Sequence, residues 1–155
     1  MRVLVFVALL LVAGARFVTA AGSAPVVVPK APAGAQPTAE ARYNAGIALG
    51  AKQDWSGAEV AYRDAIRLKS DFPEAWNGLG HALKSQKRYD ESVRAYEEAL
   101  RLRPEYPQAL EYLGEAYVQM GKTADAKRIL ERLKPLDAAQ AATLERTIGG
   151  GGGTW

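Results

Sequence analysis

The chain has 155 residues, of which 48% are hydrophobic and 24% are charged, a composition that fits one folded domain. It contains no cysteine, which excludes disulfide bonds and thiolate chemistry. The formal net charge is +3, but without Arg2 and Arg16 the remaining 18 basic residues nearly balance the 17 acidic ones. A balance this close to neutral argues against nucleic-acid binding, so we expect no nucleic-acid partner.

The first 20 residues have the pattern of a secretory signal peptide. Arg2 precedes an apolar run at 3–13, and 18–20 (Val-Thr-Ala) places small side chains where cleavage after Ala20 requires them. The run is shorter than the ~20 residues that a membrane-spanning helix needs, so we expect no stable span after cleavage. The alternative interpretation is an uncleaved anchor. The sequence predicts an exported protein, periplasmic or secreted, of a Gram-negative bacterium.

The segment 21–37 is rich in alanine and proline, and because its prolines break helices we interpret it as an extended linker. Helical patterns begin after Thr38, a good N-cap, and Asp54 is expected to cap the second helix. From there apolar residues recur at i, i+3, i+4 and i+7, which predicts helices with one buried stripe each.

These helical patterns repeat every 34 residues. Glycine recurs at Gly46, Gly80 and Gly114. The stretch 73–106 carries the fullest set of landmarks, namely Trp76, Leu79, Gly80, Leu83, Tyr89, Ser92, Tyr96, Ala99 and Pro104.

In its landmarks and period this stretch resembles the tetratricopeptide repeat (TPR), a helix–turn–helix unit of about 34 residues. The resemblance implies an all-α fold, a right-handed superhelical array of three units at about 39–72, 73–106 and 107–136. A capping helix is predicted at 137–148, with Asp137 as its N-cap and an apolar stripe of Ala141, Leu144 and Ile148, so that the repeat domain covers 38–148. The remaining residues, 149–155, form a glycine-rich stretch that we interpret as a flexible tail.

The pattern also predicts how the units pack. The recurring glycines should lie where paired helices approach most closely. Trp76 and Tyr96 should fill the space between adjacent repeats, so that truncating Trp76 would destabilise the fold by about 3–5 kcal/mol. On the surface, Glu59–Arg63 and Glu97–Arg101 are spaced for ion pairs one helical turn apart.

No catalytic constellation is present in the sequence. His81 is the single histidine, and Gly78-Leu79-Gly80 follows no strand and lacks the third glycine of a phosphate-binding loop. Glu111 and Glu115 lie one turn apart, and we interpret them as a solvated acidic patch rather than a metal site or an acid–base pair. We therefore expect no enzyme activity, no cofactor and no metal. A metal-binding or enzymatic accessory is the weaker alternative.

The resemblance further implies that the first helices of the repeats line a concave groove that binds a partner protein or an extended peptide. Carried over by position, the groove residues are Glu40, Tyr43, Asn44, Ile47, Glu74, Asn77, His81, Lys84, Gln108, Glu111, Tyr112, Glu115 and Gln119. Four glutamates against one lysine favour a neutral or basic partner. The predicted function is a non-catalytic adaptor of the bacterial envelope; the alternative is a self-assembling structural subunit, so homo-oligomers remain open.

One departure from the family bears on the partner. Chaperone adaptors of this family hold a terminal carboxylate with Lys, Asn and Arg at set groove positions. The equivalent residues here are Tyr43, Ile47, Gly78, Gln108 and Tyr112, and none is cationic. The resemblance therefore implies that this chain does not bind acidic chaperone tails.

Overall fold

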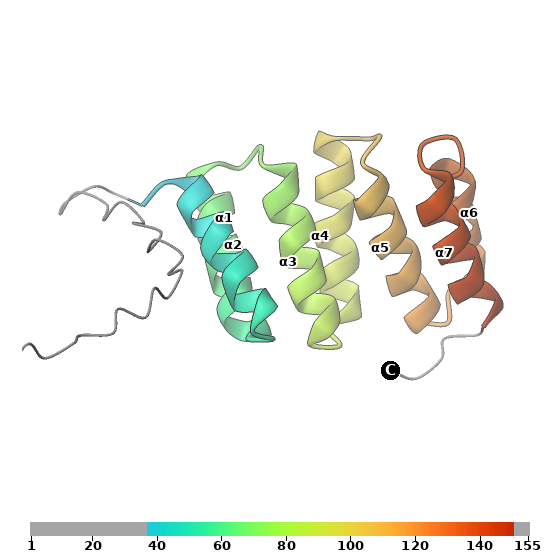
Figure 1. The fold of residues 1–155 in the computed structure, drawn as a ribbon, viewed down its shortest axis with the longest axis horizontal. Helices are drawn as coiled ribbons and strands as arrows, with labels where there is room; N and C mark the ends of the chain where they lie inside the picture. Colours follow the sequence, from blue (N-terminus) through green and yellow to red (C-terminus); the bar gives the residue numbers. More distant parts are fainter. Residues whose placement is uncertain (1–36, 151–155) are drawn as a thin grey trace, which may run out of the picture. The chain divides into compact units, whose positions relative to one another are not determined.

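A computed structural model of the chain describes residues 37–150, and within this range all regular secondary structure is α-helical (Figure 1). The helices are α1 (Ala39–Ala51), α2 (Trp55–Leu68), α3 (Pro73–Ser85), α4 (Tyr89–Leu102), α5 (Pro107–Gln119), α6 (Thr123–Leu133) and α7 (Ala138–Gly149). The predicted signal peptide, all but the last residue of the linker, and 151–155 lie outside the described residues. Among the helices at 37–150, none combines the length and the apolar character needed to cross a bilayer.

The helix ends follow local sequence rules. The Thr38 hydroxyl accepts a hydrogen bond from the Ala41 N–H at 3.1 Å, and the Asp54 carboxylate accepts one from the Gly57 N–H at 2.9 Å. Asp137 likewise caps α7. Helices α3 and α5 instead begin with proline, whose missing N–H is no loss at the first helical position. The N-caps predicted at Thr38, Asp54 and Asp137 are therefore confirmed.

The turn inside each helix pair has the same backbone conformation three times. Gln53, Lys87 and Gly121 have φ values of 60°, 62° and 71°. Left-handed backbone at this angle strains residues that carry a Cβ, so glycine at the third turn is the relaxed solution. The 34-residue period is thus visible in the backbone as well as in the sequence.

The helices alternate between two layers. Helices α1, α3, α5 and α7 lie in one layer, and α2, α4 and α6 lie in the other (Figure 1). Each helix contacts its partner in the pair, the second helix of a pair contacts the first helix of the next, and first helices also touch across repeats. The predicted all-α array of three helix pairs with a seventh helix is confirmed.

The buried core grows toward the C-terminal end of the array. Helix α1 buries only Ala39 and Gly46, whereas the last cluster joins side chains from α4, α5, α6 and α7. Leu144 of α7 is fully buried in that cluster and Ile148 packs against it. Helix α7 therefore covers the apolar side of the third repeat, as its stripe of apolar residues predicts.

The two aromatic residues of the second repeat have different environments. Tyr96 is completely buried, in line with the expectation for it. Trp76 is only partly buried, and its indole N–H donates a hydrogen bond to the Ser70 carbonyl at 2.9 Å. The expectation that Trp76 is fully buried was wrong, but its side chain packs against two core clusters and so does lie between adjacent repeats. Of the two aromatic residues, only Tyr96 has its whole surface buried.

The recurring glycines accept bulky side chains from neighbouring helices. A Cβ at Gly46 would come within 2.6 Å of the Tyr62 ring, and a Cβ at Gly80 would come equally close to Tyr96. At Gly114 the neighbour is Leu144 of α7, at 2.5 Å, rather than a residue of the paired helix α6. The third glycine thus serves the packing of the capping helix, which the repeat pattern alone did not indicate.

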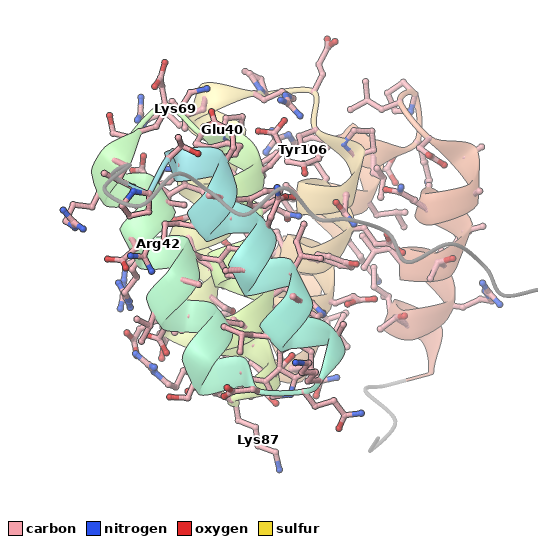
Figure 2. All side chains as sticks on the ribbon, turned by 60° about the vertical axis from the view of Figure 1, so that its left-hand side comes forward. Glu40, Arg42, Lys69, Lys87 and Tyr106 are labelled. Atoms are coloured by element: carbon pink, nitrogen blue, oxygen red, sulfur yellow. The ribbon has the colours of Figure 1, made fainter. Side chains whose placement is uncertain are left out.

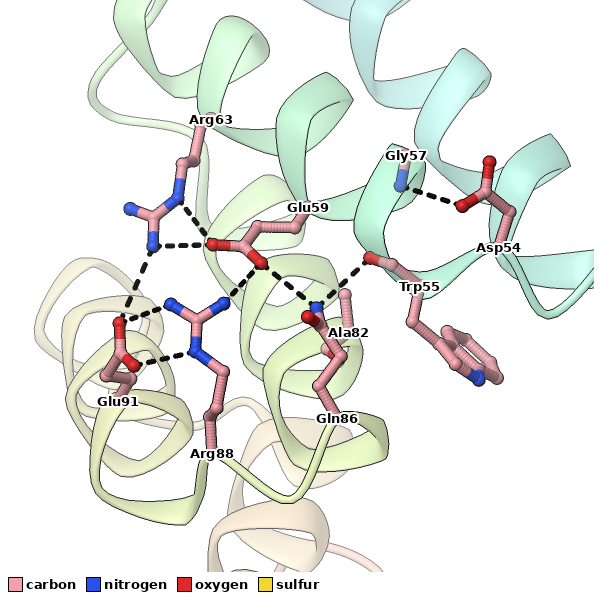
Figure 3. A network of polar contacts seen from close by, with 9 residues as sticks. All are labelled: Asp54, Trp55, Gly57, Glu59, Arg63, Ala82, Gln86, Arg88 and Glu91. Atoms are coloured by element: carbon pink, nitrogen blue, oxygen red, sulfur yellow. Dashed lines mark hydrogen bonds and ion pairs between the residues drawn. The ribbon is translucent and has the colours of Figure 1, made fainter.

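A polar network fastens the first helix pair to the second (Figure 3). The Arg88 guanidinium donates to Glu59 of α2 and to Glu91 of α4, both at 2.6 Å. Gln86 donates to Glu59 at 3.0 Å, and Arg63 pairs with the same carboxylate at 2.9 Å, which confirms the predicted Glu59–Arg63 pair. Burial alone would raise the pKa of Glu59, but hydrogen bonds from Gln86, Arg63 and Arg88 outweigh it and hold that pKa below its usual value.

The other predicted surface pair is not formed. Arg101 donates to Glu98 at 2.8 Å rather than to Glu97. Glu97 instead accepts a hydrogen bond from the Tyr117 hydroxyl at 3.3 Å, across to α5. The i,i+3 partner competes successfully with the i,i+4 partner because both spacings bring side chains onto the same helix face.

Candidate functional site

The predicted groove residues lie on three helices of the same layer, α1, α3 and α5, which we call the first-helix face. Five of them are exposed, namely Glu40, Asn44, Ile47, Gln108 and Gln119. Seven are half-buried, namely Tyr43, Glu74, His81, Lys84, Glu111, Tyr112 and Glu115. Asn77 is buried, with 5% of its surface exposed. The array thus brings the thirteen residues to one layer but does not leave all of them accessible.

At the end of the face where α1, α3 and α5 begin, a charged and aromatic pattern occurs twice. Glu74 pairs with Arg103, whose guanidinium lies 4.7 Å from the centre of the Tyr106 ring. One repeat earlier, Glu40 lies 3.9 Å from Lys69, whose ammonium group lies 5.1 Å from the Phe72 ring centre. Figure 2 shows Glu40, Lys69 and Tyr106 toward this end of the helices and Lys87 at the opposite end.

These partners change the charge of the face. Counting groove positions alone gives four glutamates and one lysine, whereas Lys69 and Arg103 enter from the loops and pair with two of the glutamates. Sequence reasoning missed them because it considered only the first helices. The 34-residue period could have found them, since Glu40/Glu74, Lys69/Arg103 and Phe72/Tyr106 are corresponding positions of consecutive repeats.

Amide and phenol groups occupy the next stretch of the face. The Asn77 side-chain amide donates to the Gln108 carbonyl oxygen at 3.2 Å, and Gln108 in turn donates to the Tyr112 hydroxyl at 3.4 Å. The buried Asn77 carbonyl oxygen has no hydrogen-bond partner among the described residues. Tyr43 turns inward, with its ring centre 5.0 Å from that of Phe72, and burial raises the pKa of its hydroxyl. Asn77 and Tyr43 therefore contribute to the packing of the first-helix face and offer little surface to a partner.

His81 lies between two aromatic rings at the centre of the face. Its ring centre is 5.2 Å from Trp55 in an edge-on arrangement and 5.3 Å from Tyr112. Burial, and then the positive charge of Lys84, lower the pKa of the imidazole, against a smaller opposing effect of Glu115. Held between these two rings, His81 contributes to the packing of the face.

Lys84 and Glu115 form an ion pair between α3 and α5, with both side chains largely covered. The Lys84 ammonium group also lies 4.7 Å from the centre of the Tyr112 ring. Next to this pair a pocket of about 410 Å³ opens between α3, α5 and α7, lined by Lys84, Ser85, Lys87, Tyr89, Glu115, Gln119, Thr143 and Thr147. Its wall includes two threonines of the capping helix, which a groove built from first helices alone does not contain.

The two glutamates singled out as a carboxylate pair have separate surroundings. Glu115 is held by Lys84, whereas Glu111 forms no ion pair with another described residue. Burial, and then the Glu115 carboxylate, raise the pKa of Glu111. Within 37–150 there is no group of three or more histidine, aspartate or glutamate side chains placed to hold a metal ion.

A second pocket, of about 500 Å³, lies on the other side of α3, next to α2 and α4. Its apolar floor includes Trp76, Leu79 and Leu83, and its charged rim includes Arg94 and Glu98. None of its lining residues belongs to the predicted groove. This Trp76 pocket provides a separate surface against which binding at the first-helix face can be compared.

Comparisons with known proteins identify the repeat. The profile of the TPR repeat family matches residues 80–121. Among solved structures, the first TPR of Spaghetti (RPAP3) bound to HSP90 peptide SRMEEVD is 19% identical, with a TM-score of 0.69 over 73% of this chain and 91% of that one. The chain has the tetratricopeptide-repeat fold. The resemblance predicted from its landmarks is confirmed.

Two further TPR structures have the same fold. The Arabidopsis OM64 TPR domain is 16% identical, with a TM-score of 0.69 over 73% of this chain and 95% of that one. The TPR2B domain of yeast Sti1, in its complex with pHsp70, is 21% identical, with a TM-score of 0.65 over 74% and 92%. A search of curated protein sequences finds no match. At these identities the likeness extends to the fold and not to the residues of the groove.

Proposed function

We propose that this TPR array is a non-catalytic interaction module that binds an extended peptide segment of a partner protein along the first-helix face. TPR domains generally mediate protein–protein interaction, and two of the similar structures are complexes, one with an HSP90 peptide and one with pHsp70. The observation that carries the proposal is the pocket between α3, α5 and α7. It combines a hollow of about 410 Å³ with amide, hydroxyl and charged groups, which can both bury a side chain and satisfy a peptide backbone.

The charges on this face favour a neutral or weakly basic segment. Three of the four glutamates already have a cationic neighbour, and Glu111 is the one without an ion pair among the described residues. A basic side chain of the partner beside Glu111 would gain an opposite charge and relieve the repulsion between Glu111 and Glu115. Glu111 is therefore the residue whose charge should matter most for binding.

Selection from a random peptide library on the full chain tests this proposal. We expect enriched peptides to be neutral or basic and to bind with micromolar affinity in calorimetry. Glu111→Lys should weaken binding about tenfold or more, as expected for replacing an attractive charge by a repulsive one. The matched variant Glu98→Lys, at the rim of the Trp76 pocket, should leave the affinity unchanged. Peptides whose affinity changes with Glu98→Lys and not with Glu111→Lys would place the binding site at the Trp76 pocket and contradict the proposal.

In chaperone adaptors of the TPR family, cationic side chains hold the terminal carboxylate of the bound peptide. The equivalent residues of this chain are uncharged, so we expect no binding of such peptides. Tyr43 packs inward and Gly78 lies against the Tyr62 ring, so neither offers a group to a terminal carboxylate. We predict no binding of the peptide SRMEEVD up to millimolar concentration in a fluorescence anisotropy titration. Micromolar binding would show that the cations Lys84 and Arg103, or other groups, replace the missing clamp.

We further propose that the protein acts in the envelope of a Gram-negative bacterium, after export and cleavage following Ala20. The support is the sequence pattern of 1–20. Expression of the full chain in such a bacterium, followed by fractionation and mass spectrometry, tests it. The expected product begins at Ala21 and is released with the periplasmic fraction or the medium. A product that retains residues 1–20 in the cytosolic fraction would contradict the proposal.

A further inference from the structure

A pocket of about 400 Å³ lies between α6 and α7, at the C-terminal end of the array. Its apolar lining is formed by Leu130 and Ile148, and two lysines also line it, Lys127 of α6 and Lys134, which directly follows that helix. Gly149, the last residue of α7, belongs to the lining. The pocket is separate from the first-helix face and shares no residue with the groove set, so neither the repeat pattern nor the proposed function accounts for it.

We propose that this α6/α7 pocket binds an aromatic side chain and that its occupant is Trp155 of the same chain. The first argument is reach. Trp155 follows Gly150 by five residues, which span at most about 17 Å when extended, and the pocket begins at Gly149 itself. Positions 151–153 are glycines, which can adopt the positive-φ conformations that a reversal of chain direction needs.

The second argument is chemical fit. Leu130 and Ile148 offer apolar contact to the body of an indole ring. Lys134 is paired with Glu131 at 2.7 Å, whereas Lys127 forms no ion pair with another described residue. An ammonium group is attracted to the face of an aromatic ring, and tryptophan is the strongest partner for it. Glu131 and Glu145 also line the pocket, and an acceptor of this kind suits the indole N–H.

The third argument is free space where the chain leaves α7. A Cβ placed on Gly149 would meet no heavy atom within 4 Å, in contrast to the crowded glycines of the helix pairs. The route from the helix end into the pocket is therefore open. Because the occupant is tethered, its effective concentration is in the millimolar range, so a pocket too weak to bind free indole would still be filled.

Occupation by Trp155 would cover apolar surface at the C-terminal end of the array. In repeat proteins the terminal unit needs a cover, since the side that would face the next repeat is otherwise exposed. Here α7 covers the third repeat, and Trp155 would cover the seam between α6 and α7. This inference does not depend on what binds to the first-helix face.

Fluorine NMR of the full chain labelled with 5-fluorotryptophan tests the proposal directly. The three tryptophans, Trp55, Trp76 and Trp155, give three signals, and Trp155→Phe identifies the one of interest. We expect a soluble paramagnetic agent to relax the Trp155 signal at least threefold less than that of free fluorotryptophan. Deletion of 151–153 changes no pocket residue but shortens the reach, so it should raise the relaxation to the free value.

Two lining variants locate the contact. Lys127→Glu should increase the exposure of Trp155, whereas the neighbouring Arg128→Glu, outside the pocket, should not. Protection must also be independent of protein concentration. A Trp155 signal as exposed as free tryptophan in the unaltered chain would overturn the proposal. So would protection that appears only at high concentration, which would assign the occupant to a second copy, or protection that survives the deletion of 151–153.

Discussion

The ring of Tyr96 lies directly against Gly80, so closely that a Cβ on this glycine would come within 2.6 Å of two ring carbons. The whole surface of the Tyr96 side chain is buried, so none of it contacts solvent. A rigid ring held in a closed site cannot move aside for an added methyl group. The pair therefore fixes the distance between α3 and α4.

A series of glycine-to-alanine variants tests this contact. Gly80→Ala should destabilise the fold by about 1–3 kcal/mol, because overpacking outweighs the better helix propensity of alanine. Gly114→Ala meets the two methyl carbons and the Cγ of Leu144, a buried side chain with more rotamer freedom than a ring, and should lose less stability. Gly50→Ala, whose Cβ would lie 3.4 Å from Trp55, should be stabilising by about 0.5–1 kcal/mol. Urea denaturation monitored by circular dichroism gives all three values; equal losses at Gly80 and Gly114 would contradict the argument.

The hydroxyl of Tyr96 is buried without a hydrogen-bond partner among the described residues. Removing it in Tyr96→Phe should therefore leave stability unchanged or raise it by up to about 1 kcal/mol, since no hydrogen bond is lost. Tyr96→Ala should cost about 3–5 kcal/mol. Trp76→Ala should cost less than Tyr96→Ala because Trp76 is only partly buried. Thermal unfolding of the three variants measures the order of their stabilities. A larger loss of stability for Trp76→Ala than for Tyr96→Ala would show that Trp76 is the main packing residue.

The Lys84–Glu115 pair joins α3 to α5 with both side chains largely covered. Removing one partner leaves the other charge in a partly dry site, so Lys84→Met and Glu115→Gln should each destabilise by about 1–2 kcal/mol. The double variant should lose less than the sum, which a double-mutant cycle by urea denaturation will show. Additive losses would mean that the two groups contribute separately and that the pair does not couple the repeats.

The single histidine allows a direct pH test. Burial and Lys84 lower the pKa of His81, so its proton NMR signal should titrate below 6.5, and Lys84→Met should move the midpoint upward. A pKa lower in the folded than in the unfolded state means that the unfolded chain binds the proton first. The stability due to neutral His81 is therefore complete above pH 6.5 and decreases as the pH falls below it.

The same linkage has a consequence for stability. His81→Phe keeps a ring between Trp55 and Tyr112 but does not titrate. The loss of stability between pH 7.5 and pH 5.5 should be smaller in this variant than in the unaltered chain, as measured by urea denaturation. An equal loss in both would show that groups other than His81 set the acid sensitivity of this region.

Much of the fold could be predicted from local features. Thr38, Asp54 and Asp137 cap helices because their side chains reach the free N–H groups of the next few residues, and no distant contact is needed. The array follows from the 34-residue period, since each unit has an apolar side that only a similar neighbour can cover. The sequence could not predict whether Arg101 pairs with Glu97 or with Glu98, because Glu97 accepts a hydrogen bond from Tyr117 of another helix, α5.

The candidate site could be predicted in outline but not in its accessible groups. The period places Glu74, Asn77 and His81 on one layer, yet Asn77 is buried by its contact with Gln108 and Glu74 is paired with Arg103. Lys69 and Arg103 were missed because they lie in the loops that follow second helices. Thr143 and Thr147 were missed because α7 was considered a cover for the core and not a wall of the pocket.

The sequence by itself determined the elements, their order and the layer to which each belongs. These follow from caps, turns and the apolar period, which act over a few residues or between equivalent units. Only the tertiary structure decided which side chains meet: Tyr96 rather than Trp76 at the centre of the core, Leu144 against Gly114, and Lys84 against Glu115. Such pairings depend on distances between helices, and those distances are set by the shapes of all the packed side chains together.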